Sequence, residues 1–177
     1  MSKAKLKKYI AELTAEQVGE ILLQVYDASK EAKGWLDFYL NPDIEGLSEK
    51  YRKQIHLKCY GRTGRARRPK MRDCNQLIKT FSTIVQDPTP VADLMLYFME
   101  EVTRVATAKG RYSESYFRTL TGQLRKTLEY LAAHGLLEYN MPRVRKIIGL
   151  AEGSSRFLAQ DYEDALADVD ELNFHKL

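Results

Sequence analysis

The chain has 177 residues, of which 44% are apolar and 29% are charged, and its formal net charge is +4. This composition is typical of a folded globular protein and argues against a disordered chain. The longest stretch without a charged residue, 130–137, is far shorter than the roughly 20 residues of a membrane-spanning helix. Two cysteines are too few to hold such a domain together through disulfides. We therefore expect a soluble, cytoplasmic protein that does not contact a membrane.

Apolar residues recur at helical spacing along most of the chain, and strand-like alternation is nearly absent. Thr14 and Gln17 form a capping box ahead of one apolar stripe, and Ser113 and Gly135 bracket another as N-cap and stop. In chain order, the stripes predict helices that include 6–13, 18–25, 74–85, 91–106, 116–131, 144–148 and 158–169.

Proline, glycine and asparagine mark the breaks between these helices. Residues 41–43 end one helix, 87–90 form a tight corner, 140–142 open a short helix, and 153–155 precede the last one. A loop at 61–69 is rich in glycine and arginine and separates an N-terminal from a C-terminal helix group. We predict an all-α fold: a compact stack of eight or nine antiparallel amphipathic helices in a single domain, 1–177. The helix lengths are also compatible with HEAT-like helix pairs.

Four stretches, taken together, carry a family resemblance. They are Leu6–Tyr9, Asp37–Pro42, the arginine-rich loop running into Arg68–Lys70, and Ala92–Tyr97. With them the chain resembles an all-helical bacterial family that is known only as a domain of unknown function. The resemblance covers nearly the whole chain and implies a helical fold in one domain. It implies no activity, cofactor or catalytic residue.

Positive charge is concentrated in one segment. Between Arg52 and Arg72 the chain carries nine basic residues and no acidic one, so the rest of the chain sums to −5. Such a patch attracts polyanions and acidic partners. We predict a polyanion-binding site within 58–72 whose guanidinium and ammonium groups converge on phosphate oxygens. Its candidate residues are Lys58, Arg62, Arg65, Arg67, Arg68, Lys70 and Arg72.

An acidic C-terminal segment offers an alternative role for this charge. If the segment folds over the basic loop, of the same chain or of a second copy, the positive charge is neutralised by protein rather than by a ligand. Its acids are Glu152, Asp161, Glu163, Asp164, Asp168, Asp170 and Glu171.

Metal binding and catalysis are less favoured by the sequence. His56 and Cys59 have a workable spacing for zinc, but Cys74 falls on the apolar stripe of the next helix and no fourth ligand lies nearby. An acidic helix face formed by Asp164, Asp168 and Glu171 lacks the glycine-turned loop of an EF-hand. No nucleophile motif of the G-x-S-x-G type is present. We therefore predict no metal site, no cofactor and no enzymatic activity.

Amphipathic helices without a reactive group of residues favour a role in binding. The leading hypothesis is a non-catalytic intracellular helical module that binds another protein or a second copy of itself. Opposite charges on the basic loop and the acidic tail would favour a head-to-tail or two-fold dimer. The alternative hypothesis is nucleic-acid or other polyanion binding through the basic segment 58–72.

Overall fold

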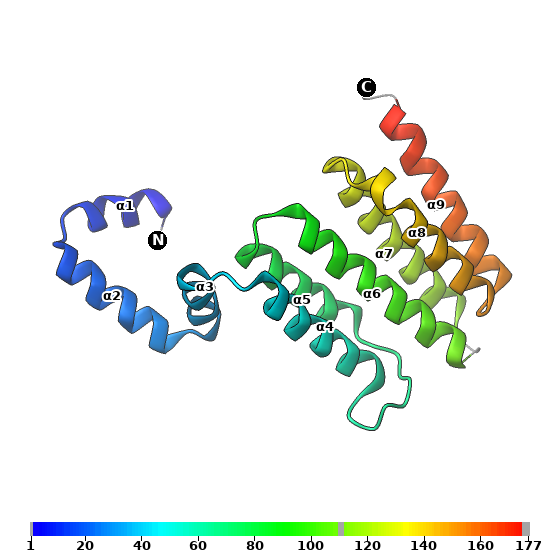
Figure 1. Ribbon diagram of the computed structural model, residues 1–177, viewed down its shortest axis with the longest axis horizontal. Helices are drawn as coiled ribbons and strands as arrows, with labels where there is room; N and C mark the ends of the chain where they lie inside the picture. The colour runs from blue at the N-terminus through cyan, green and yellow to red at the C-terminus, as the bar shows by residue number, and fades with distance from the viewer. Residues whose placement is uncertain (1, 110–111, 175–177) are drawn as a thin grey trace. The chain divides into compact units, whose positions relative to one another are not determined.

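The computed structural model describes residues 2–109 and 112–174, and within them it contains nine α-helices and no strand (Figure 1). This confirms the all-α prediction and the number of helices, whereas their antiparallel order and HEAT-like pairing stay predictions. The helices are α1 (Lys3–Ala11), α2 (Ala15–Ala28), α3 (Lys30–Leu40), α4 (Ile44–Tyr60), α5 (Met71–Ile84), α6 (Pro88–Lys109), α7 (Glu114–Ala133), α8 (Leu137–Glu152) and α9 (Arg156–Phe174).

Contacts within the chain group it into two compact units. Unit 1 is Met1–Asp43 and contains α1 to α3, and unit 2 is Ile44–Leu177 and contains α4 to α9. The basic loop therefore lies inside unit 2, between α4 and α5. The prediction of a single domain stays a prediction.

Unit 1 consists of three helices that bury no residue. Its α2 packs on α3, where the Tyr26 hydroxyl donates a hydrogen bond to Asp37 Oδ1 at 2.9 Å and Lys33 Nζ lies 4.9 Å from the centre of the Tyr26 ring. Neither α1, α2 nor α3 contains a buried side chain. We expected the apolar stripe that includes Ile21 and Val25 to face a core. However, Ile21 is 38% exposed and Val25 is 44% exposed. That expectation is wrong for unit 1.

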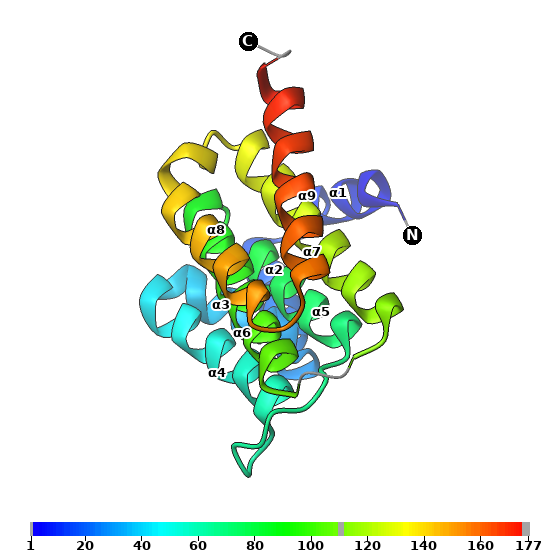
Figure 2. The same cartoon turned by 90° about the vertical axis from the view of Figure 1, so that its right-hand side faces the viewer.

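Unit 2 is built around α6. This helix contacts α4, α5, α7 and α8, while α9 packs on α7 and α8 (Figures 1 and 2). Apolar side chains on several sides of α6, among them Leu94, Leu96, Phe98 and Met99, are fully buried. A helix that is apolar over so much of its circumference is stable only at the centre of a bundle. The predicted stripes on α5, α7, α8 and α9, together with Tyr51, Ile55 and Cys59 of α4, supply the rest of the core.

Local signals place several helix ends as predicted. The Thr14 hydroxyl accepts the Gln17 amide hydrogen and the Gln17 side chain accepts the Thr14 amide hydrogen, which completes the capping box. Gly135 follows α7 with φ +67°, and the next amide reaches back to Leu131 O at 2.8 Å, as in a Schellman motif.

One predicted helix start is wrong. We expected residues 140–142 to open a short helix, but α8 begins at Leu137 and Pro142 lies inside it. Pro142 is the sixth residue of α8, so the helix continues past it without one hydrogen bond, the one that an amide at this position would donate to the Glu138 carbonyl. The side-chain amide of Asn140 donates to Leu136 O at 2.9 Å and supports the first turn of α8.

Candidate functional site

The basic loop is held in place by its own arginine. Arg67 donates from Nε to Lys58 O at 3.2 Å and from Nη2 to Leu57 O at 2.9 Å, and its amide donates to Cys59 O at 2.8 Å. These carbonyls lie in the last turn of α4, where helix carbonyls lack intrahelical partners and attract a cation. Gly61 and Gly64 adopt φ of +64° and +69°, which lets the chain turn back toward this position. Arg67 is therefore a helix cap rather than a free ligand-binding residue.

Two more of the seven predicted site residues have partners within the chain. Lys58 Nζ pairs with Asp73 Oδ2 at 3.2 Å, so the base of the loop is tied to α5. The Arg68 guanidinium lies 4.4 Å from the centre of the Tyr116 ring on α7, which is a cation–π contact. Arg67 and Arg68 thus fix the loop on unit 2, and Lys58 joins the two helices that flank it.

The other four predicted residues face solvent. Arg62, Arg65, Lys70 and Arg72 are exposed, and none forms an ion pair with the described residues. They belong to the loop and to the first turn of α5. We call these four residues the exposed cation set.

A face of α4 leads up to this set, with Lys53 and His56 exposed and Tyr60 half-buried. Lys53, His56 and Tyr60 follow one another at i, i+3 and i+7, and the His56 and Tyr60 rings stack with centres 4.6 Å apart. His56 Nδ1 also lies 2.9 Å from Glu101 Oε2, which fixes the imidazole ring. The predicted site omitted Lys53, although its helical spacing from His56 is a signal that the sequence contains.

The acidic tail is engaged elsewhere. Glu163 pairs with Arg145 of α8 at 2.6 Å and Asp168 pairs with Arg125 of α7 at 2.5 Å. No acid of the described part of α9 pairs with the loop, and the side chain of Glu171 lies outside the described residues. Within the described chain, the tail therefore does not neutralise the exposed cation set.

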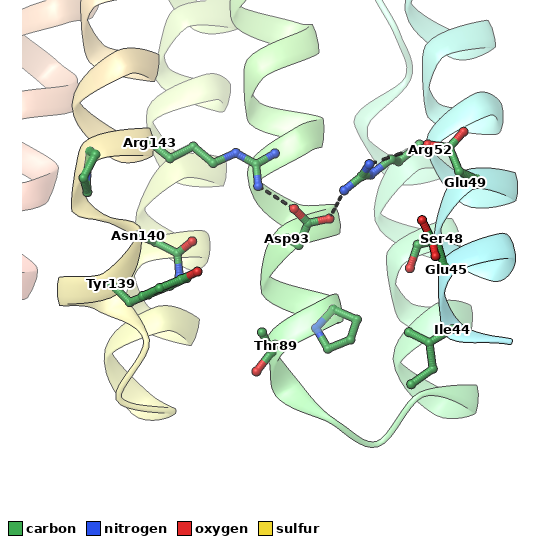
Figure 3. Close-up of a pocket in the computed structure, with 12 residues that line it drawn as sticks. Ile44, Glu45, Ser48, Glu49, Arg52, Thr89, Asp93, Tyr139, Asn140 and Arg143 are labelled. Carbon is green, nitrogen blue, oxygen red and sulfur yellow. Dashed lines mark hydrogen bonds and ion pairs between the residues drawn. The ribbon is translucent and has the colours of Figure 1, made fainter. Parts of the chain in front are cut away.

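A second feature of unit 2 is an open hollow of about 750 Å³ at the first turns of α4, α6 and α8 (Figure 3). Glu49 and Arg52 line it from α4, Asp93 from α6, and Tyr139 and Arg143 from α8. In Figure 3 the side chains of Arg52 and Arg143 approach Asp93 from opposite sides. This grouping was not predicted from the sequence.

Of the five charged residues that line the hollow, Glu49, Arg52, Asp93 and Arg143 are paired with one another, whereas Glu45 forms no ion pair with the described residues. Arg143 donates from Nε to Glu100 and from Nη1 to Asp93, both at 2.6 Å, and Arg52 donates to the other oxygen of Asp93. Burial by itself would lower the pKa of Arg143, but its hydrogen bonds to Glu100 and Asp93 outweigh that effect and raise the pKa. Asp93 and Glu100 lie seven residues apart on one face of α6, and this spacing is the only feature of the sequence that indicates the network. The network joins three helices and is fully explained by that role.

The two thiols are buried inside unit 2. Burial raises the pKa of Cys59 to about 12, and the nearby Cys74 and Glu101 add to this effect through charge. Burial also raises the pKa of Cys74 to about 11. Both therefore stay protonated at neutral pH, and thiols are weak nucleophiles and weak metal ligands. No group of three or more His, Cys, Asp or Glu side chains is placed to hold a metal among the residues described. None of the described helices has the length and apolarity needed to cross a membrane.

Comparisons with other proteins give a family but no function. No curated protein and no solved structure matches the chain. The resemblance to a family of unknown function is confirmed, while its bacterial origin stays a prediction. Residues 1–168 match the model of a family described as a family of unknown function (DUF6155), and the chain belongs to that family.

Proposed function

We propose that the protein is a non-catalytic interaction module in which unit 1 provides the surface that docks on another protein chain. A single observation carries this proposal: none of the described residues of unit 1 is buried, yet ten of its large apolar side chains are exposed. These are Leu6, Tyr9, Ile10, Ile21, Leu22, Leu23, Val25, Trp35, Tyr39 and Leu40.

Unit 2 provides the contrast that makes this observation informative. Among its described residues only four large apolar side chains are exposed, and they are scattered over three helices: Ile44, Leu57, Tyr139 and Phe157. Isolated exposed apolar residues are normal on a protein surface, whereas large contiguous patches mark interaction sites. The apolar surface available to a partner is therefore concentrated in unit 1.

The small size of unit 1 supports the same conclusion. A unit of this length rarely buries enough apolar surface to be stable by itself. Each Å² of apolar surface covered by a partner contributes about 25 cal/mol, so a partner that covers the helices stabilises them as it binds. Docking and ordering of unit 1 are then coupled.

Two features of unit 2 support a non-catalytic and intracellular role. Its buried cysteines are protonated at neutral pH, and Arg52, Asp93 and Arg143 of its hollow are engaged with one another. Both cysteines are free thiols, which fits a reducing compartment such as the cytoplasm.

The test compares two matched variants of the full-length protein. Leu22→Asp/Val25→Asp places two charges on the apolar surface of α2, and Tyr139→Asp/Phe157→Asp places two charges on exposed apolar positions of unit 2. Associated proteins are quantified after co-purification, and each is then purified and titrated by calorimetry. Sedimentation velocity measures self-association over a range of concentrations.

We expect association to be lost in the α2 variant and kept in the unit 2 variant, because only the first charges the docking surface. Hydrogen exchange of the dilute protein by itself is the measurement that can contradict the proposal. If the amides of α1 to α3 are strongly protected in a monomer, and if both variants keep the same associations, the apolar surface is covered within the chain and the proposal is wrong.

A further inference from the structure

We propose a second binding surface, independent of unit 1: the exposed cation set and the adjoining face of α4 bind single-stranded nucleic acid. The cations would contact the phosphates, and the stacked pair of His56 and Tyr60 would receive a base. The proposal rests on the arrangement of these groups in unit 2 rather than on the net charge of the chain.

The loop presents its cations from a fixed backbone. Arg67 caps α4 and Arg68 lies on Tyr116 of α7, so the loop is anchored to two helices, and the Lys58–Asp73 ion pair joins α4 and α5, which flank it. A phosphate-binding group on an anchored loop loses less conformational freedom on binding than one on a mobile chain. Lys58, Arg67 and Arg68 thus hold the loop and its flanking helices in place for the exposed cation set.

The exposed cation set keeps its charge available. Arg62, Arg65, Lys70 and Arg72 have no ion-pair partner among the described residues, and the described acids of α9 that form ion pairs do so with α7 and α8. All four lie within eleven residues of sequence, in the loop and at the start of α5. Guanidinium groups bind phosphate oxygens through paired hydrogen bonds, and a local group of them suits a phosphodiester backbone.

The chemistry beside the loop favours nucleic acid over a lipid surface. Residues 61–70 contain no large apolar side chain that could enter a bilayer, whereas helices that bind membranes carry several. The face of α4 instead presents a cation, Lys53, and the ring pair of His56 and Tyr60, with a ring-plane angle of 26°. Aromatic side chains beside a basic groove are the usual platform for unpaired bases.

The number of free cations sets a quantitative expectation. With four phosphate contacts on a single strand, the slope of log affinity against log salt is about −3, so affinity falls about 50-fold between about 50 and about 200 mM salt. Removing two of the contacts halves the slope, and the fall over the same range becomes about sevenfold.

Fluorescence anisotropy with labelled single-stranded oligonucleotides of mixed sequence tests these values on the full-length protein. Arg62→Ala/Arg65→Ala removes two members of the set, and Lys126→Ala/Lys146→Ala removes two exposed lysines of α7 and α8 as a control with the same change in net charge. Circular dichroism checks that both variants fold. We expect a loss of affinity of tenfold or more with a halved salt slope in the first variant, and unchanged binding in the second.

Three results would overturn the proposal. The first is the absence of salt-dependent oligonucleotide binding by the unmodified protein. The second is an equal loss in both variants, which would reduce the effect to net charge. The third is binding to phosphatidylserine vesicles without binding to oligonucleotides. His56→Ala tests the base platform: a weaker affinity for single strands with an unchanged salt slope supports it, and unchanged affinity removes that part.

Discussion

At the scale of single residues, Arg143 shows how a buried charge network holds helices together. Its guanidinium joins Asp93 and Glu100, which lie 50 and 43 residues away in the sequence. The side chain of Glu100 is only 11% exposed, and its other ion pair, with Arg104, is longer, at 3.9 Å against 2.6 Å to Arg143. An acid left buried without its cation costs more free energy than the ion pair itself contributes.

We therefore expect Arg143→Ala to lower the free energy of unfolding by about 2 kcal/mol. Arg145, two residues away on α8, forms an ion pair with Glu163 in which both side chains are about half exposed. Arg145→Ala should change stability by about 0.5 kcal/mol or less. Urea denaturation measures both values, and equal effects would show that the network around Asp93 has no special weight.

At the residue scale, one part of the candidate site can be predicted from the sequence and another part cannot. The density of positive charge is evident from the sequence. Four of the seven predicted cations lie in the expected loop at 61–69, whereas Lys58 lies on α4 and Lys70 and Arg72 lie at the start of α5. The sequence does not show which of these cations lack a partner within the chain. Asp73 and Tyr116 come from other helices and reach Lys58 and Arg68 only in the folded chain. The sequence shows how many cations lie close together, and the packing of the helices determines which of them form contacts within the chain.

At the scale of elements, local chemistry predicts helix ends well where a side chain or glycine sets them. Thr14 with Gln17 and the turn at Gly135 follow the expected pattern. Pro142 misled the prediction, because a proline near a helix start is compatible with either a new helix or the first turns of an existing one. Only the hydrogen bond from the Asn140 amide to Leu136 O shows that the helix begins earlier.

The cap of α4 leads to a prediction about the loop. Arg67→Ala removes two side-chain hydrogen bonds to carbonyls in the last turn of α4, and stability should fall by about 1 kcal/mol. Arg65→Ala removes an exposed charge of the same type and should leave stability within about 0.5 kcal/mol of the original. Thermal unfolding followed by circular dichroism compares the two. If the Arg65 variant loses as much stability as the Arg67 variant, Arg67 does not act as a cap.

At the scale of the whole molecule, burial is divided unevenly between the units. The buried apolar residues all belong to unit 2, where they form a core around α6. The helices of unit 1 are nine, fourteen and eleven residues long, and isolated helices of this length are marginally stable in water. The two units should therefore differ sharply in stability.

This difference can be measured on fragments. Residues 44–177 alone should unfold cooperatively with a stability within about 1 kcal/mol of the intact chain, because no buried side chain is removed. A peptide of residues 1–43 should have much less helical signal than its three helices would give. Circular dichroism of both fragments at low concentration provides the readout. An unfolded 44–177 fragment would show that unit 2 needs unit 1 for its stability.

The sequence by itself determined the all-α fold, most of the helix positions and the concentration of positive charge, because periodicity, capping and charge density are properties of neighbouring residues. Only the tertiary structure decided which apolar stripes are covered. Those of α5 and α7 are buried against α6 and α9, while that of α2 remains exposed, although all three have the same spacing. The same holds for the cations, since an arginine becomes a cap, a ring contact or a free charge according to what distant segments place beside it.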